Sequence, residues 1–240
     1  MPLLGLIGYP LAHSFSPEYF KNKFTEENLS DWDYQAFPIS EIDQLPELID
    51  LHPNLLGFNV TIPHKTEVLK YCHILSEEVE EIGAANFILI DPKTKLLSAF
   101  NTDFWGFTQS LLSWYKGNGR ALVLGNGGSS KAVQYALQRL DVSFDVCTRN
   151  GALNYGNINF GIYTLIVNCT PVGMNGNSNA EGCLDLQYEQ IHSAHYFYDL
   201  VYNPENTPMM QKFTEHGAKV KNGLEMLHLQ ADKAWEMVKA

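Results

Sequence analysis

The sequence predicts an α/β protein with two sheet-containing domains, and three observations support this prediction. Short apolar runs alternate with amphipathic stretches along the 240 residues, a pattern typical of strands joined by crossover helices around a mostly parallel sheet. The runs form two series, separated by one helix with an apolar pattern. The hydrophobic content of 45% is enough to fill the cores of two such domains.

The first series lies before residue 103 and predicts one sheet domain. Helices are expected after Ser16, after Ser40 and after Pro63, so that strands and helices alternate. The predicted strands are residues 3–7, 34–37, 58–62, 87–90 and 97–100.

The second series predicts another domain made of strand-helix-strand units. Between the two series, residues 103–115 predict a helix that ends before the helix-breaking cluster 116–119, and we expect this helix to act as a hinge. A final helix is expected over residues 224–238, and its pattern allows packing on either domain. The predicted strands are residues 121–124, 144–148, 165–168, 196–200 and 218–221.

Composition and charge exclude several classes of function. The net charge of -11 and the pI near 5.1 argue against a surface that collects nucleic acid or anionic lipid. The four cysteines are scattered, so we expect no disulfide framework, no zinc site and a cytoplasmic location. No basic leader opens the chain, and no apolar stretch approaches the roughly 18 residues that span a bilayer. His192 and His195 stand three residues apart, but we expect a surface pair and no metal.

A glycine-rich turn follows the first strand of the second series. Residues 121–124 run into Gly125, Asn126, Gly127, Gly128, Ser129 and Ser130, and a helix over residues 131–140 follows. Glycines permit close backbone approach, and the helix N-terminus offers N–H groups and a positive dipole end to a pyrophosphate. Ser130 occupies the third small position of GxGxxG, so the match is loose, and an ordinary strand-to-helix turn is the alternative. The surrounding strands favour a dinucleotide site.

The end of the next strand indicates which dinucleotide binds. NAD-selective sites usually carry an acidic residue about 20 positions beyond the glycines, but Thr148, Arg149 and Asn150 occupy that place. We therefore expect Arg149 to bind a 2′-phosphate, which favours NADP; a solvated loop arginine is the alternative. Asn168 and Thr170 belong to a turn expected to line the nicotinamide. Met174 is expected to lie on that ring or, alternatively, in the core.

The first domain carries the candidates for catalysis. Reduction of a ketone by hydride needs a positioned proton donor, and Lys65 and Asp103 both follow strands of the first sheet. A solvated lysine and a helix-capping aspartate are the alternatives. Their neighbours favour a site, because short polar residues in apolar strands must find hydrogen-bond partners. Ser14 and Ser16 are expected to bind a carboxylate, although Ser16 before Pro17 is also a plausible N-cap. The other polar residues are Asn59, Thr61, Asn86, Asn101 and Thr102.

Taken together, these residues resemble the shikimate dehydrogenases, the family that reduces 3-dehydroshikimate to shikimate with a nicotinamide cofactor. The match covers nearly the whole chain. Besides the glycine turn, the motifs are His13-Ser14-Phe15-Ser16-Pro17, Asn59-Val60-Thr61-Ile62-Pro63-His64-Lys65, Gly83-Ala84-Ala85-Asn86, Asn101-Thr102-Asp103, Asn168-Cys169-Thr170, Asp199-Leu200-Val201-Tyr202, Thr207-Pro208 and Gly223-Leu224-Glu225-Met226-Leu227.

The resemblance implies a mechanism and a division of labour. Lys65 would donate the proton to the C3 oxygen as hydride arrives, and Asp103 would orient it. Residues 1–102 and 223–240 would form the substrate-binding and catalytic domain, and residues 103–222 a Rossmann-like NADP-binding domain. Shikimate would contact Ser14, Ser16, Asn59, Thr61, Asn86, Tyr202 and Gln230. The cofactor would contact Gly125, Asn126, Gly127, Gly128, Ser129, Ser130, Thr148, Arg149, Asn168, Thr170 and Gly223.

The sequence departs from the family at the predicted phosphate clamp. Many members carry a second arginine three residues beyond the first, whereas here residues 151–153 are Gly, Ala and Leu. A quinate or quinate/shikimate dehydrogenase using NAD is therefore an alternative, although two hydroxyls at Ser14 and Ser16 favour shikimate. A non-catalytic dinucleotide-binding sensor is another alternative, against which intact Lys65 and Asp103 argue. Monomer and homodimer are both open.

Overall fold

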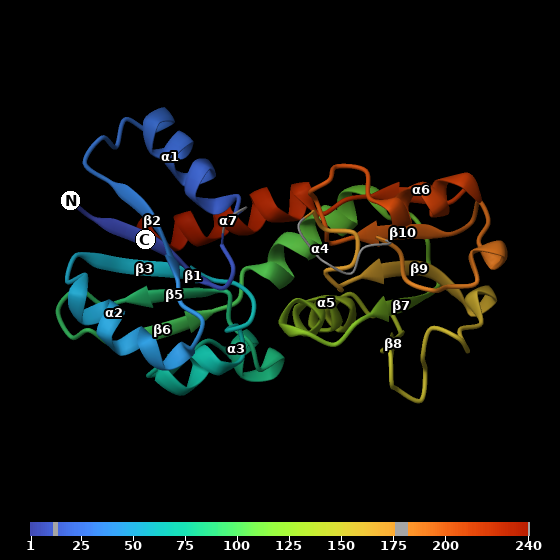
Figure 1. Ribbon diagram of the computed structural model, residues 1–240, viewed down its shortest axis with the longest axis horizontal. Coiled ribbons are helices and arrows are strands. Elements are labelled where there is room, and N and C mark those ends of the chain that lie inside the picture. The colour runs from blue at the N-terminus through green and yellow to red at the C-terminus, as the bar shows by residue number, and fades with distance from the viewer. Residues whose placement is uncertain (12–13, 176–181, 240) are drawn as a thin grey trace. The chain divides into compact units, whose positions relative to one another are not determined.

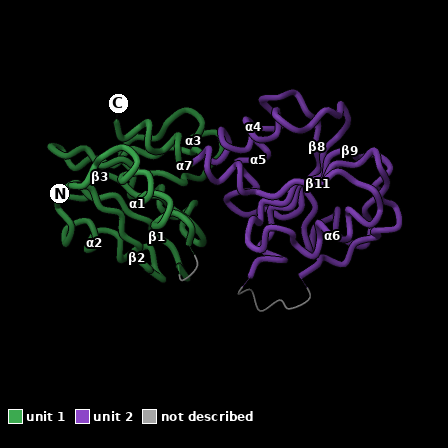
Figure 2. The backbone as a smooth tube through the Cα atoms, turned by 90° about the horizontal axis from the view of Figure 1, so that it is seen from above, with its two compact units in different colours: residues 1–102, 231–240 green, residues 103–230 purple. Residues whose placement is uncertain are grey.

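The structure is a computed structural model that describes residues 1–11, 14–175 and 182–239. The chain divides into two compact units, one formed by Met1–Thr102 and Ala231–Ala240 and the other by Asp103–Gln230 (Figure 1; Figure 2). Each unit contains a mostly parallel sheet covered by helices, which confirms the predicted α/β class.

The sheet of the first unit has the strand order β2-β1-β3-β5-β6-β4. Only β5 is antiparallel to its neighbours, because its pairings with β3 and β6 are antiparallel and the other pairings are parallel. The elements are β1 (Leu3–Gly8), α1 (Ser16–Glu26), β2 (Asp33–Pro38), η1 (Ile42–Gln44), α2 (Leu45–Leu51), β3 (Leu55–Val60), η2 (Glu67–Tyr71), β4 (Ile74–Leu75), α3 (Glu77–Ile82), β5 (Phe87–Ile90) and β6 (Leu97–Phe100).

Both faces of the first sheet are buried, as the side chains of β1 illustrate. Successive residues of a strand point to opposite faces. Leu4 and Leu6 pack with α1 and with Trp235, while Leu3 and Ile7 pack with α2, η2 and α3 on the other face (Figure 1). Burial on both faces explains why β1 is apolar throughout rather than alternating.

The sheet of the second unit is entirely parallel, with the order β11-β10-β9-β7-β8. The chain passes from β7 outward to β8 and then returns to the other side of β7 as β9. The direction of winding therefore reverses between β7 and β9, which is where doubly wound folds bind ligands. The elements are α4 (Asp103–Trp114), β7 (Arg120–Leu124), α5 (Gly128–Arg139), β8 (Phe144–Cys147), η3 (Phe160–Ile162), β9 (Tyr163–Asn168), η4 (Tyr188–Gln190), β10 (Tyr196–Asp199), α6 (Pro208–Glu215), β11 (Lys219–Lys221) and α7 (Leu224–Lys239).

Two cores cover the second sheet. Phe107 of α4 and Val133 of α5 pack with Met226 of α7 on one face. Met209 and Phe213 of α6 pack on the other face with η3 and η4. The sheet is therefore sandwiched, and only its strand ends are left for a ligand.

Several elements differ from the sequence prediction. The expected helix after Pro63 is the short 3-10 helix η2, since the turn begins with Thr61 accepting from the His64 N–H and ends in extended backbone at Cys72. α5 begins three residues before Lys131, so the predicted turn supplies the first turn of the helix. The sequence prediction omitted β4, α3 and α6, each too short for a clear apolar period.

The final helix belongs to both units. The family resemblance implied that residues 223–240 join the first domain. Residues from Ala231 onward cluster there, whereas the part of α7 up to Gln230 clusters with the second unit. The reason is close packing of α7 on α4: an ideal Cβ on Gly106 of α4 would lie 2.7 Å from the carbonyl oxygen of Met226 and 3.1 Å from the Cβ of Gln230.

Among the described residues, we find no helix with the length and apolar character that a membrane span requires.

Candidate active site

Polar side chains of the first unit gather at one edge of its sheet. The carboxyl ends of β1, β3 and β6 lie at this edge, and the amino end of antiparallel β5 lies there too. The sequence-predicted residues at this edge are Ser14, Ser16, Asn59, Thr61, Lys65, Asn86, Asn101 and Thr102. His13 lies outside the described residues.

Ser16 and Asn59 are linked through Tyr34, a residue the sequence analysis did not select. The Tyr34 hydroxyl donates to Asn59 Oδ1 at 2.9 Å and also hydrogen-bonds the Ser16 side chain. Burial raises the pKa of Tyr34, so the phenol keeps its proton and remains a donor. α1 begins at Ser16 with Phe15 as its N-cap and without a side-chain capping bond. The alternative of Ser16 as an N-cap is therefore wrong, and its hydroxyl belongs to the polar cluster.

Asn86 and Thr102 form a reciprocal pair that joins β5 to the segment after β6. Asn86 Nδ2 donates to Thr102 Oγ1 at 2.9 Å, and the Thr102 N–H donates to Asn86 Oδ1 at 2.6 Å. Asn101 Nδ2 donates to the Ala84 carbonyl at 2.9 Å. The three side chains are at most 3% exposed. Backbone positioning thus accounts for part of the polar character that the sequence analysis assigned to substrate.

Lys65 is fixed by its backbone, with its side chain half-buried. Its carbonyl accepts from the Ala85 N–H at 2.8 Å, which connects it to the residue before Asn86. The preceding turn is anchored by buried His64, whose Nε2 lies 2.8 Å from the Ile39 carbonyl oxygen. Thr61, at the start of this turn, donates its N–H to the Ile7 carbonyl at 3.0 Å. The lysine therefore extends from a backbone held on both sides.

Asp103 and Gln230 are placed by the second unit. Asp103 is the first residue of α4 and is 6% exposed, and Gln230 on α7 is equally buried. Gln230 packs against Gly106, one turn after Asp103, and its Nε2 donates to the Leu227 carbonyl at 3.0 Å. Small Gly106 thus permits the close approach of these two helices.

The glycine turn, residues 125–130, connects β7 to α5 at the edge where the winding reverses. Gly125 has φ +99, a conformation that other residues rarely adopt, and an ideal Cβ there would lie 3.0 Å from Thr170 Cγ2. Ser130 is fully buried and its hydroxyl donates to the Gly125 carbonyl at 2.7 Å. The Ser130 side chain therefore links the last residue of the turn to the first.

This turn fits the pyrophosphate of a dinucleotide. Gly127 is exposed, and an ideal Cβ on it would meet no heavy atom within 4 Å. The first turn of α5 carries no acidic residue. The N-terminus of α5, with the positive end of its helix dipole, therefore lies next to an open surface at Gly127, as anion binding requires.

The segment after β8 presents Arg149 to solvent. The turn of residues 148–157 is closed by its own hydrogen bonds, including Thr148 N–H to the Leu153 carbonyl at 3.2 Å and Asn157 Nδ2 to the Ala152 carbonyl at 2.8 Å. Among the ion pairs of the described residues, none involves Arg149. The acid of β8, Asp145, is bound to Arg120 and Tyr163. Arg149 therefore has no carboxylate to neutralise it within this described segment.

Asn168 is fully buried and holds the turn after β9. Its Oδ1 accepts from the Thr170 N–H at 3.0 Å and from Thr170 Oγ1 at 2.7 Å, while its Nδ2 donates to Asp199 at 2.8 Å. The Asn168 amide thus fixes the position of Thr170.

Gly223 is required by packing, because an ideal Cβ on it would lie 2.2 Å from the Leu200 carbonyl oxygen. Tyr202 is half-buried after β10.

Comparison with known proteins identifies the family. The model of the shikimate dehydrogenase substrate-binding domain matches residues 6–88. A shikimate dehydrogenase (NADP(+)) of Clostridium botulinum is 34% identical over 250 residues, covering 96% of this chain and 93% of the relative. The chain belongs to the shikimate dehydrogenase family.

Solved structures of the shikimate dehydrogenase family share the whole fold. The enzyme of Peptoclostridium difficile superimposes with a TM-score of 0.85 at 31% identity, covering 100% of this chain and 92% of that one. The enzyme of Thermus thermophilus in complex with NADP(H) and shikimate gives a TM-score of 0.86 at 28% identity, covering 99% and 93%.

Burial decides two expectations outside the shikimate dehydrogenase motifs. The prediction of a surface histidine pair is wrong for His195, which is 1% exposed and hydrogen-bonds the Phe160 carbonyl and the His192 N–H. Burial lowers its pKa. Met174 is 40% exposed, so the alternative of a core methionine is wrong. The four cysteines are free, and no group of three or more metal-ligating side chains was found among the described residues.

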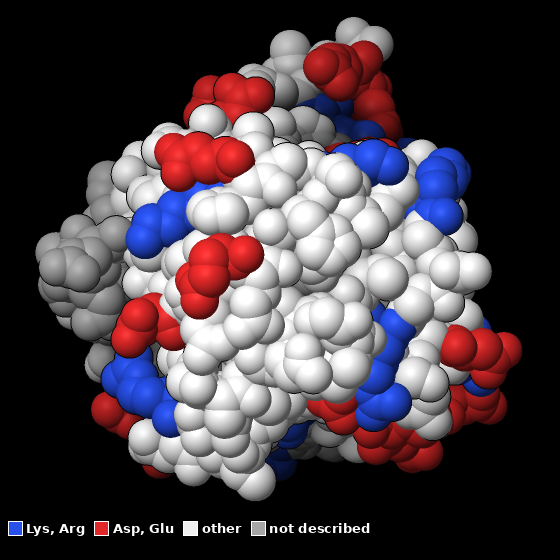
Figure 3. All heavy atoms as spheres, turned by 90° about the vertical axis from the view of Figure 1, so that its right-hand side faces the viewer, with Lys and Arg blue, Asp and Glu red and all other residues white. Residues whose placement is uncertain are grey.

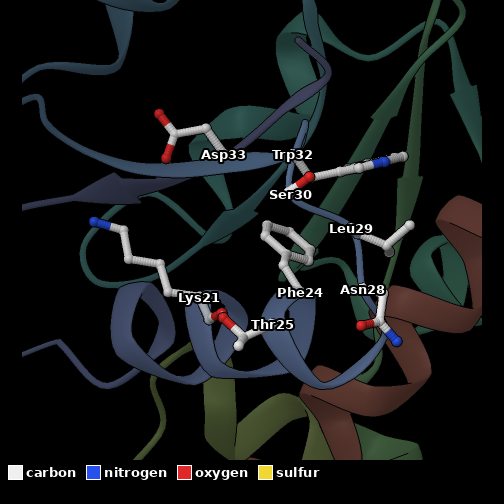
Figure 4. Close-up of a pocket in the computed structure, with 8 residues that line it drawn as sticks. All are labelled: Lys21, Phe24, Thr25, Asn28, Leu29, Ser30, Trp32 and Asp33. Carbon is white, nitrogen blue, oxygen red and sulfur yellow. The ribbon is translucent and has the colours of Figure 1, made fainter.

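Two surface features lie apart from the shikimate dehydrogenase motifs. A hollow of about 560 Å³ lies between α1 and the start of β2, bordered by Phe24, Trp32 and Asp33 (Figure 4). Because β1 to β3 run parallel, the start of β2 lies at the opposite sheet edge from Asn59. On the face drawn in Figure 3, the described acidic and basic side chains are interspersed.

Proposed function

We propose that this chain is an NADP-dependent shikimate dehydrogenase that interconverts 3-dehydroshikimate and shikimate. The observation that carries the proposal is the gathering of the family's polar residues at one edge of the first sheet, in a chain that also has the open glycine turn. A dinucleotide-binding sensor that performs no reaction would not need a lysine at position 65 beside these polar residues.

Substrate binding is assigned to hydroxyls and amides of the polar cluster. Ser14 and Ser16 would bind the carboxylate, and Asn59, Thr61 and Asn86 the ring hydroxyls. The Ser16–Tyr34–Asn59 contacts support this assignment, because they hold two of these side chains in fixed positions before substrate arrives. Tyr202 and Gln230 of the second unit would complete the contacts.

Proton transfer is assigned to Lys65. During reduction its ammonium group would donate a proton to the C3 oxygen of 3-dehydroshikimate, and during oxidation its amine would take the proton back. Asp103 would orient the ammonium group and accept a hydrogen bond from a ring hydroxyl. The anchored backbone of residues 61–65 supports this role, since proton transfer requires accurate placement.

The second unit would hold the cofactor through the glycine turn, Thr170 and Arg149. When bound, the nicotinamide supplies or accepts the hydride. The exposed Arg149 would bind the 2′-phosphate with charge-assisted hydrogen bonds. Because this clamp has a single arginine, we expect discrimination between NADP and NAD to be weaker than a two-arginine clamp would give.

Replacement of the proposed proton donor tests the function. Lys65→Ala should lower the kcat for shikimate oxidation by about 100-fold or more while shikimate affinity, measured by calorimetry, changes only a few-fold. The control is Lys70→Ala. Lys70 is an exposed lysine of η2 that pairs with Asp43 of η1, and this variant should retain activity. Wild-type protein without shikimate turnover, or equal losses of turnover in both variants, would refute the proposal.

A further inference from the structure

Asp199, at the carboxyl end of β10, is a fully buried carboxylate to which the proposed function assigns no role. Its Oδ1 accepts from Asn168 Nδ2 at 2.8 Å and from the Val201 N–H at 3.0 Å. Its Oδ2 accepts from Thr207 Oγ1 at 2.7 Å. One side chain therefore connects three separate segments: the end of β9, the turn after β10 and the start of α6.

The contacts continue from Asp199 to the glycine turn. Asn168 uses its other amide atom to accept both the N–H and the hydroxyl of Thr170. Thr170 in turn lies against Gly125, with its methyl group 3.0 Å from the position of an ideal Cβ on that glycine. The order Asp199, Asn168, Thr170, Gly125 is thus a continuous set of contacts from the core of the second unit to the proposed cofactor site.

A second contact of Asp199 leads to a residue that the proposed function assigns to the substrate. The Val201 N–H bound by Asp199 immediately precedes Tyr202, which the proposed function assigns to shikimate. Fixing Val201 therefore fixes the backbone from which Tyr202 extends. The same carboxylate therefore constrains Thr170, which is assigned to the cofactor, and the backbone of Tyr202, which is assigned to the substrate.

A purely structural role explains this carboxylate less well. Thr207 caps α6 by accepting from the Met210 N–H, a bond that does not require Asp199. None of the ion pairs of the described residues involves Asp199, so burial of its charge is offset by hydrogen bonds alone. Burial accordingly raises its pKa to about 6. An apolar residue would fill the site at lower cost if packing were the only requirement.

We propose that Asp199 is a positioning residue, which acts through Asn168 and Val201 to hold Thr170 and Tyr202 in place for NADP and shikimate. The inference rests on the proposed function. If it is correct, the affinity for NADP depends on Asp199 and not on a carboxylate elsewhere in the same sheet.

A matched control exists on the same sheet. Asp145 of β8 also accepts three hydrogen bonds, two from Arg120 and one from Tyr163. Arg120 and Tyr163 begin β7 and β9, so this cluster lies at the amino edge, away from the glycine turn. Loss of Asp145 should therefore affect stability without affecting cofactor binding.

The experiment measures the Kd for NADP by calorimetry, together with Tm, in purified variants. Asp199→Ala should raise the Kd about ten-fold or more. Asp199→Asn, whose Oδ1 can still accept from Asn168 and Val201, should restore the Kd to within a few-fold of wild type. Asn168→Ala should reproduce the loss and remains informative if Asp199→Ala fails to fold. Asp145→Ala should lower Tm and leave the Kd within about two-fold.

The outcomes separate this inference from the proposed function. Absence of NADP binding by wild-type protein would refute the proposed function itself. If the wild type binds NADP but Asp199→Ala and Asn168→Ala bind it equally well, or if Asp145→Ala loses as much affinity, Asp199 has no positioning role. With shikimate, Asp199→Ala should also raise KM, whereas a role limited to the cofactor would leave it unchanged.

Discussion

Single residues determine how the polar cluster is held, and Tyr34 is the clearest case. Its hydroxyl joins Ser16 to Asn59 from within the sheet core, where it is 1% exposed. A buried donor without its acceptor costs about 1 to 3 kcal/mol, so the three side chains stabilise one another's positions. Side chains proposed to contact the substrate are therefore held in place by a buried core residue.

Arg149 is the residue on which cofactor preference should depend. Arg149→Ala removes the charge-assisted bonds proposed for the 2′-phosphate, so the Kd for NADP should rise by about ten-fold or more while the Kd for NAD stays within about two-fold. Calorimetric titration with each cofactor measures both values. Arg139→Ala, at the far end of α5, is the matched control and should change neither. An unchanged ratio of the two affinities in Arg149→Ala would show that another group reads the phosphate.

At the scale of elements, two glycines of the glycine turn are expected to differ, with Gly125 affecting stability and Gly127 affecting cofactor binding. Gly125→Ala must adopt φ +99 against Thr170 and should lower stability by about 1 kcal/mol or more. Gly127→Ala has open space and negative φ, so it should cost no more than about 1 kcal/mol.

If the pyrophosphate lies on Gly127, however, the added methyl group of Gly127→Ala should weaken NADP binding by about ten-fold. Urea unfolding and calorimetry together test this pair of variants. NADP affinity unchanged in Gly127→Ala would place the pyrophosphate elsewhere.

The sequence was informative where an element is long or marked by glycine. Strands β7 and β9 were predicted because each is a bounded apolar run, and the glycine turn was predicted because Gly125 to Gly128 interrupt the pattern. β4 and α3 were not predicted, since a strand of two residues and a helix of six carry too little periodicity.

Candidate residues were predicted from chemistry, but their partners were not. Asn59 and Asn86 stood out as polar residues in apolar strands, whereas Tyr34 looked like an ordinary core aromatic. Asp199 appeared in a family motif without a role, because only the structure shows that β9, β10 and α6 meet at its carboxylate. Hydrogen bonds between distant segments depend on sheet order, which a single sequence does not display.

For the whole molecule, the pH dependence of the free energy of unfolding should show the raised pKa of Asp199. Its folded-state pKa of about 6 lies above its ordinary 3.8, so the folded protein holds this proton more tightly than the unfolded chain does. Its contribution is fully present below about pH 3.8 and is lost as the pH rises through about 6. Asp145, whose pKa is lowered by the hydrogen bond from Arg120, contributes in the opposite direction.

The difference in unfolding free energy between wild type and Asp199→Asn isolates this term from the other carboxylates. The advantage of the wild type should shrink by roughly 2 to 3 kcal/mol from about pH 4 to about pH 7, because the amide does not titrate. Urea unfolding across this range measures it. A difference that stays constant with pH would show that Asp199 is not a perturbed carboxylic acid in the folded protein.

The substrate and the cofactor together define the function of the whole chain. Steady-state oxidation of shikimate or quinate, each with NADP or NAD, compares the four combinations in one measurement of kcat/KM. The highest kcat/KM is expected for shikimate with NADP, and a detectable but lower kcat/KM for shikimate with NAD. A higher kcat/KM for quinate, or no turnover in any combination, would contradict this expectation.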